Sequence, residues 1–232
     1  MILFFLPHAG GSAKSYCTFR RYLPKELKVI PMELSGRLMR SSEPMLTDIQ
    51  SCAADLINVH REALSSEGYA LFGHSLGTLL CTELVRQLSA EGIHQPEHVF
   101  LSGRCTPDLE LHCIEDAETA TDEEIVKYFL GSSLMQPMAI PDPQLKEILD
   151  RNLCTDVRMA ERYSVTPEEV RFPCDLTVMY GTEDRILQGA DMAQWERFTA
   201  GRCEVIPFTG DHFYYNAHKQ EVCEIIADRL NI

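Results

Sequence analysis

The chain has 232 residues, of which 45% are hydrophobic and 24% charged, as in an ordinary globular protein. Its 35 acidic and 21 basic side chains give a formal net charge of −14. Because phosphate groups attract positive charge, this balance argues against a strong nucleic-acid binder and against an anionic membrane surface. We expect neither a nucleic-acid partner nor a membrane partner.

Nine cysteines lie at wide, irregular spacing, and no C-x-x-C pair occurs. This pattern favours reduced thiols in a reducing compartment over a disulfide framework or a zinc site. The early apolar run Ile2–Leu6 is far shorter than the ~18 residues of a membrane helix and too short for a signal peptide. We therefore expect a cytoplasmic protein, most simply a monomer, with no metal.

Short apolar runs alternate with helical patterns along the chain. Strands are predicted, in chain order, at Ile2–Leu6, Val29–Met32, Tyr69–Gly73, Val99–Ser102, Leu176–Tyr180 and Cys203–Phe208. Helical periodicity occupies residues 14–23, 46–65, 76–90 and 216–230 between or after them. Strands separated by helices imply right-handed crossovers and a mostly parallel sheet flanked by helices, an α/β fold.

One connection is too long for a simple crossover. Gly103 and Asp175 are separated by 71 residues, whereas a whole βαβ unit needs roughly 30. The segment has helical patterns near 121–131 and 143–163, separated by Pro137, Pro141 and Pro143. We interpret residues 104–170 as a helical lid insertion over the carboxyl edge of the sheet, and residues 1–103 and 171–232 as the core. Its apolar residues either face a ligand or pack the insertion onto the core: Ile125, Phe129, Leu130, Leu134 and Met135.

The segment Gly73-His74-Ser75-Leu76-Gly77 matches G-x-S-x-G. A predicted strand precedes it and a predicted helix follows, which is the context of a nucleophile elbow in an α/β-hydrolase fold. Glycines at the flanks allow the strand and helix backbones to approach closely. Ser75 is the candidate nucleophile, and the Leu76 N–H is a candidate oxyanion donor.

A serine nucleophile needs a base and an orienting acid, and in this fold the acid precedes the base in the chain. Asp184 follows the strand Leu176–Tyr180 and is the first choice of acid, with neighbouring Glu183 as the alternative. His212 follows the next strand and is the candidate base. Asp211 adjoins it in the chain, which makes triad geometry between the two awkward.

The loop after the first strand reads Pro7-His8-Ala9-Gly10-Gly11-Ser12. A second oxyanion donor usually comes from a loop at this place, and paired glycines let the backbone turn its amides inward. We expect the Ala9 N–H to be that donor. His8 is better placed to shape the site than to take a proton.

These motifs together resemble the free-standing type II thioesterases that accompany nonribosomal peptide and polyketide synthases. The resemblance rests on Pro7–Ser12, Gly73–Gly77 and Gly210-Asp211-His212-Phe213, and it spans nearly the whole chain. It includes Ser35-Gly36-Arg37, which is similar to the family's Pro-Gly-Arg, with serine in place of proline.

The resemblance implies an α/β-hydrolase fold in which Ser75, Asp184 and His212 form the triad, and Ala9 and Leu76 the oxyanion hole. It also implies hydrolysis of acyl thioesters on the phosphopantetheine arm of acyl or peptidyl carrier proteins, without a cofactor. The alternatives are a medium-chain fatty acyl thioesterase, a general small-ester hydrolase and an acyltransferase. An intact Ser-Asp-His set argues against a non-catalytic binding protein on the same fold.

Basic side chains are concentrated near the start of the chain. The predicted helix 14–23 carries Lys14, Arg20 and Arg21, and Lys25 and Lys28 follow. Because carrier proteins are generally acidic, we expect this local surface to be a candidate docking site despite the net negative charge.

Overall fold

The computed structural model describes residues 1–65, 68–109, 114, 117–131 and 142–232. Six parallel strands form one sheet in the order β2-β1-β3-β4-β5-β6. Their bounds are Ile2–Leu6 (β1), Lys28–Pro31 (β2), Tyr69–His74 (β3), His98–Ser102 (β4), Asp175–Gly181 (β5) and Cys203–Phe208 (β6). The predicted α/β fold with a parallel sheet is confirmed, and every predicted strand is present.

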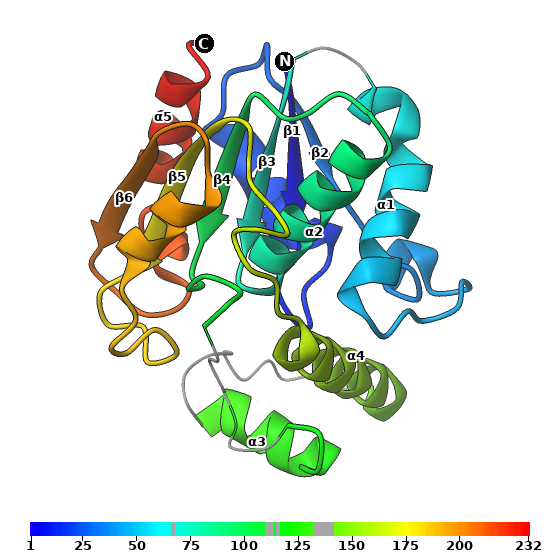
Figure 1. The fold of residues 1–232 in the computed structure, drawn as a ribbon. Coiled ribbons are helices and arrows are strands. Elements are labelled where there is room, and N and C mark those ends of the chain that lie inside the picture. Colours follow the sequence, from blue (N-terminus) through cyan, green and yellow to red (C-terminus); the bar gives the residue numbers. More distant parts are fainter. Residues whose placement is uncertain (66–67, 110–113, 115–116, 132–141) are drawn as a thin grey trace.

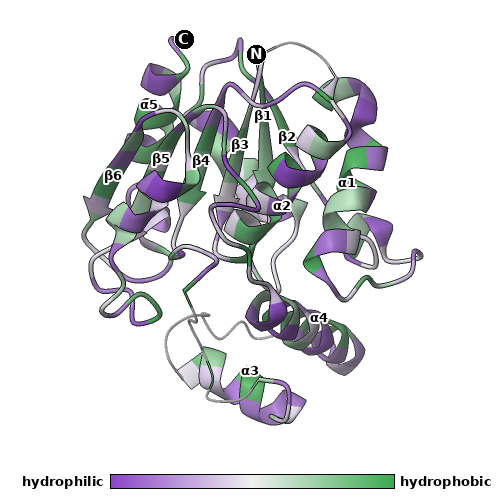
Figure 2. Ribbon diagram, in the orientation of Figure 1, coloured by the Kyte–Doolittle hydropathy of each residue, from purple (hydrophilic) through white to green (hydrophobic). Residues whose placement is uncertain are grey.

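Both faces of the central strands β1, β3, β4 and β5 are buried, which explains why these strands are largely apolar runs. In β1, Phe4 and Leu6 pack into one core with α1 (Ile49–Leu64) and α2 (Leu76–Ala90). Leu3 and Phe5 point the other way, toward η1 (Ala13–Arg21) and α5 (Lys219–Arg229). Figure 1 shows α1 and α2 covering the near face of the sheet, and the strands are among the most hydrophobic elements in Figure 2.

All strands end at the same edge of the sheet, since they are parallel. The loops that carry Ala9, Ser75, Asp184 and His212 follow β1, β3, β5 and β6 at this edge. Four distant parts of the sequence are thereby gathered at one place, where α/β proteins bind their ligands.

The insertion contributes α3 (Asp122–Gly131) and α4 (Pro143–Arg162), which lie beyond the carboxyl ends of the strands (Figure 1). Side chains from α3 and α4, which include Ile125, Phe129, Leu153 and Val157, form a second small core together with Ile186 of the loop after β5. The lid role of the insertion and its boundaries stay predictions. Leu134, Met135, Pro137 and Pro141 lie outside the described residues.

The two halves of α4 differ in burial. Its first half is exposed, whereas Met159 and Ala160 near its end belong to the main core. Tyr163 and Val165, which follow the helix, are also part of that core. The end of the expected insertion is therefore anchored on the body of the protein.

Three 3₁₀-helices complete the fold besides η1: η2 (Leu38–Arg40), η3 (Met192–Phe198) and η4 (Tyr214–Asn216). The periodicity had not indicated η3, whose Trp195 and Phe198 are completely buried. All eight cysteines among the described residues are free thiols. Nowhere in this described part of the chain is a helix long and apolar enough to cross a membrane.

Candidate active site

Ser75 lies at the sharp turn between β3 and α2. Its backbone has φ 55° and ψ −114°, a strained conformation for a residue with a side chain. The flanking glycines are required by space: a Cβ on Gly73 would lie 2.2 Å from the Gly77 carbonyl oxygen, and one on Gly77 would lie 2.5 Å from the Leu6 oxygen. The Ser75 N–H donates to the Ser102 carbonyl at 2.8 Å, which fastens the turn to β4.

The loops after β5 and β6 bring Asp184 and His212 together. His212 Nδ1 lies 2.7 Å from Asp184 Oδ2, and both residues are buried. Asp184 Oδ1 accepts from the Ile186 N–H at 3.0 Å, so the carboxylate is held at both oxygens. A hydrogen bond of this kind holds an imidazole in one tautomer and leaves Nε2 for proton transfer.

The geometry distinguishes between the three acids near His212. Glu183 is exposed, and its N–H donates to the Gly210 carbonyl at 2.9 Å. Asp211 is also exposed, and its Oδ1 accepts from the Phe213 N–H at 2.9 Å, within its own turn. Of the three, Asp184 makes the recorded contact with the imidazole.

The Pro7–Ser12 loop approaches the elbow because β1 pairs with β3. Gly10 has φ +69°, a conformation that favours glycine. The Gly10 N–H donates to Asp156 Oδ2 at 2.9 Å, and the Gly11 N–H donates to the His8 carbonyl at 2.9 Å. Among the hydrogen bonds recorded for the described residues, the Ala9 N–H has no acceptor.

Leu76 is the first residue of α2. The N–H groups of a first helical turn have no acceptor within the helix, and the helix dipole favours negative charge at this end. The Leu76 and Ala9 amides are thus suited to stabilise an oxyanion beside Ser75.

His74 connects the elbow to the His212 loop, a link that the sequence motifs did not indicate. Its Nδ1 lies 2.9 Å from Ser102 Oγ, which lies 2.7 Å from the Tyr214 hydroxyl. The rings of His74 and His212 have centroids 4.7 Å apart. A Cβ on Gly103 would lie 2.5 Å from His74 Cε1, so only glycine leaves room for this ring.

The two further histidines at the site favour the neutral state. Burial, together with the nearby His212, lowers the pKa of His8 to about 4. Burial also lowers the pKa of His74 well below its usual value, and His212 and His8 add to this effect. Two neutral rings thus line the site beside His212.

A cavity of about 750 Å³ lies beside the His212 loop and the Pro7–Ser12 loop. Its lining includes His8, Gly10, Leu130, Leu149, Leu153 and Phe213. The cavity joins the two loops of the site to apolar side chains of α3 and α4. Of the apolar residues expected to face a ligand, Leu130 lines it, whereas Ile125 and Phe129 pack between the two helices. No cluster of ligands suited to a metal ion occurs in the regions that the structure describes.

Comparisons with known proteins agree with this arrangement. The thioesterase domain family model matches residues 1–230. Gramicidin S biosynthesis protein GrsT of Aneurinibacillus migulanus is 27% identical over 230 residues, which cover 99% of this chain and 89% of GrsT. The crystal structure of ClbQ from the colibactin NRPS/PKS pathway has a TM-score of 0.90 and 27% identity, with 99% of this chain and 96% of ClbQ covered.

The type II thioesterase BorB from the borrelidin biosynthetic cluster is also similar. Its structure has a TM-score of 0.86 and 30% identity, and the match covers 99% of this chain and 92% of BorB. The predicted resemblance to type II thioesterases and the predicted α/β-hydrolase fold are confirmed. The chain belongs to the thioesterase domain family, and it is a hydrolase that acts on thioesters.

Proposed function

We propose that Ser75, His212 and Asp184 form the catalytic triad. Ser75 Oγ attacks the thioester carbonyl while His212 takes its proton, and Asp184 stabilises the resulting imidazolium. His212 returns this proton to the sulfur as the C–S bond breaks, so a thiol leaves and an acyl group remains on Ser75. His212 then takes a proton from water as the water attacks this ester, and gives it to Ser75 Oγ when the carboxylic acid is released.

The observation that carries this proposal is the 2.7 Å contact between His212 Nδ1 and Asp184 Oδ2. It has weight because the two residues come from different loops and are both buried. The packing of His74 on His212 supports it, since Ser75 is the next residue in the chain.

In this mechanism the negative oxygen of each tetrahedral intermediate lies between the N–H groups of Ala9 and Leu76. Support comes from the next two amides of the loop. The N–H groups of Gly10 and Gly11 already donate to Asp156 and to the His8 carbonyl, whereas the Ala9 N–H has no recorded acceptor among the described residues. A preorganised donor of this kind raises kcat by about 10²–10³-fold.

The substrate in this proposal is an acyl group on the phosphopantetheine arm of an acyl or peptidyl carrier protein. The support is that ClbQ comes from an NRPS/PKS pathway, GrsT from gramicidin S biosynthesis and BorB from the borrelidin cluster. Hydrolysis would clear incorrect or stalled acyl groups from the synthase. The apolar part of the lining of the 750 Å³ cavity, which includes Leu130, Leu149 and Leu153, is chemically suited to an acyl chain.

The proposal also gives α3 and the first half of α4 the role of a lid over this cavity. Leu130 and Leu149 line the cavity from these helices. The second half of α4 is anchored in the main core, so movement would be confined to the parts before it.

The test compares one set of acyl groups on three leaving groups: a holo carrier protein, coenzyme A and p-nitrophenol. Mass spectrometry would follow release of the acid from the carrier, with Ser75→Ala as the control. We expect kcat/KM to be at least about tenfold higher for the carrier than for coenzyme A, because the protein surface adds binding energy. Equal values for the three would favour the general esterase.

A further inference from the structure

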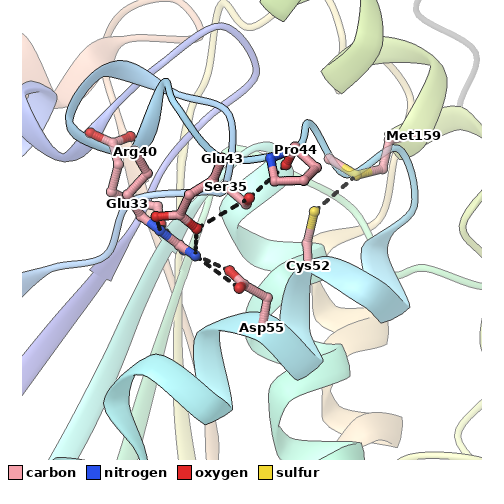
Figure 3. Close-up of polar contacts among 8 residues, drawn as sticks. All are labelled: Glu33, Ser35, Arg40, Glu43, Pro44, Cys52, Asp55 and Met159. Carbon is pink, nitrogen blue, oxygen red and sulfur yellow. Dashed lines mark hydrogen bonds and ion pairs between the residues drawn. The ribbon is translucent and has the colours of Figure 1, made fainter.

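The segment between β2 and α1, residues 32–48, is fastened to its surroundings by several hydrogen bonds. We call it the β2–α1 loop. Arg40 donates to both oxygens of Asp55, at 2.6 and 2.8 Å, and to the Glu33 carbonyl at 3.0 Å. Ser35 Oγ donates to the Pro44 carbonyl at 2.6 Å. Figure 3 shows these contacts, through which the serine hydroxyl closes the loop at the position where the related motif has proline.

Arg37 extends from this loop into the interior. Its side chain forms an ion pair with Asp156 of α4, and the two residues are only 2% and 1% exposed. Burial raises the pKa of Asp156, and the Arg37 charge opposes that rise. A buried ion pair is weak evidence for stability, because apolar residues of similar volume are often at least as stabilising. A role other than stabilising the fold is therefore a better explanation for a buried pair beside the loop that contains Ala9.

Asp156 has a second partner, the Gly10 N–H, which donates to Oδ2 at 2.9 Å. The carboxylate thus connects the β2–α1 loop through Arg37 to the loop that contains Ala9. A methionine–cysteine contact of 3.6 Å, between Met159 and Cys52, holds the same helix turn against α1 (Figure 3).

Two hydrogen bonds hold the peptide planes on either side of Ala9. The peptide plane before Ala9 is held by the Gly11 N–H, which donates to the His8 carbonyl at 2.9 Å. The plane after Ala9 is held by the Gly10 N–H, which donates to Asp156. Because peptide units are rigid planes, Ala9 lies between two units that are both fixed, one locally and one by α4.

We propose that Asp156, whose buried charge Arg37 compensates, is a positioning residue that aims the Ala9 N–H at the oxyanion. This rests on the proposed function, in which Ala9 is a donor of the oxyanion hole. Asp156 touches neither substrate nor nucleophile in this account. It acts only through Gly10, and Arg37 serves to balance its charge.

The test uses two double variants that both remove the ion pair. Arg37→Met with Asp156→Asn keeps an oxygen that can accept from the Gly10 N–H. Arg37→Met with Asp156→Leu has the same net charge and a similar volume but offers no acceptor. The kcat and KM of each are measured with a p-nitrophenyl ester, which does not depend on carrier binding. The inhibition constant of a boronic acid, whose tetrahedral adduct places an oxygen anion in the hole, is measured as well.

We expect the Asn variant to keep kcat within about threefold of the wild type. The Leu variant should lose about tenfold or more in kcat, with KM nearly unchanged and boronate affinity reduced in parallel. Removal of an oxyanion donor lowers kcat by about 10²–10³-fold, and a misdirected donor should cause part of that loss. Equal kcat values for the two folded variants would overturn the proposal. If the Leu variant does not fold, Arg37→Met with Asp156→Ala replaces it and carries the same expectation.

Failure of the positioning role is distinguishable from failure of the proposed function. A fluorophosphonate that labels Ser75 in the wild-type protein establishes the nucleophile independently. If Ser75 is labelled and the two variants have equal kcat, the mechanism stands and the role of Asp156 falls. If the wild type is not labelled at Ser75, the mechanism itself is wrong.

Discussion

The ring of His74 packs against the ring of His212, with 4.7 Å between their centroids. His74 precedes the candidate nucleophile, and His212 is the candidate base. This one contact therefore joins the turn that carries the nucleophile to the loop that carries the base. The Ser102 hydroxyl reinforces it by joining His74 to Tyr214, which lies two residues after His212. The local geometry of the site thus depends on a neutral, buried imidazole that takes no part in proton transfer.

Neutral histidines make the stability of the protein depend on pH. The pKa of His8 is lowered to about 4 in the folded state, below the ~6.5 of an unfolded chain. The neutral ring therefore favours folding, and this contribution is complete above pH 6.5 and is lost as pH falls toward 4. Between pH 7 and pH 5 the free energy of unfolding should fall by about 2 kcal/mol more in the wild type than in His8→Gln. Urea denaturation at the two pH values measures this, and parallel losses would contradict it.

Substitution of the three acids near His212 tests which one orients it. Asp184→Asn should lower kcat about 10⁴-fold, because the amide favours the wrong imidazole tautomer. Glu183→Gln and Asp211→Asn are matched controls and should each stay within a few-fold of the wild type, since neither carboxylate contacts the imidazole. Steady-state kinetics with a p-nitrophenyl ester measures all three. A crippled Glu183→Gln protein would mean that the acid is assigned one position too late.

Carrier docking is expected at the start of η1 rather than at its end. Arg20 donates to the Val29 carbonyl at 2.7 Å, and Val29 pairs with Leu3 near the amino end of β1. The last turn of η1 therefore lies away from the carboxyl edge of the sheet, where the site is. Lys14 is exposed at the other end of η1, beside the Pro7–Ser12 loop.

Lys14→Glu should accordingly lower kcat/KM for an acyl carrier protein several-fold at low salt, and the loss should shrink in 0.5 M salt as charges are screened. Lys25→Glu changes an equally exposed lysine after the far end of η1 and should leave the rate unchanged. Turnover of a p-nitrophenyl ester should not respond to either substitution. Identical losses in the two variants would place docking elsewhere.

Hydrogen exchange tests whether the insertion moves. Amides of α3, whose buried side chains Ile125 and Phe129 lie in the small core, should exchange faster than amides of residues 152–160, whose last residues Met159 and Ala160 belong to the main core. Binding of a non-hydrolysable acyl thioether analogue should slow exchange in α3 more than in residues 152–160. Slow exchange throughout α3 in the free protein would count against a lid.

The sheet could be predicted from sequence because its central strands are largely apolar runs with both faces covered. The run Cys203–Phe208 coincides with β6 itself. The motifs that contain Ser75 and His212 follow the runs predicted to be β3 and β6. Because the carboxyl ends of parallel strands share an edge, the sequence also predicted that these two residues lie at the same edge of the sheet. Periodicity also indicated α4, but not that one half of it is exposed and the other half anchored.

Contacts between distant residues were beyond such patterns. The choice between Asp184 and Glu183 depends on how the loop after β5 turns, and that loop is held by the Thr182 N–H, which donates to the Phe208 carbonyl at 2.8 Å. The pair of Arg37 and Asp156 joins residues 119 positions apart, and no spacing rule indicates it. The direction of η1, which carries Arg20 away from the site, follows from its packing on the sheet.

The most direct test of the central claim is to find the acyl group on Ser75. The protein is mixed with an acyl-pantetheine thioester, quenched in acid within the first turnover, and digested for mass spectrometry. We expect the acyl mass on the peptide that contains Ser75, and its absence in Ser75→Ala, whose turnover should fall on the order of 10⁶-fold while its circular dichroism stays native. An acyl group on another residue, or full turnover by natively folded Ser75→Ala, would contradict the account.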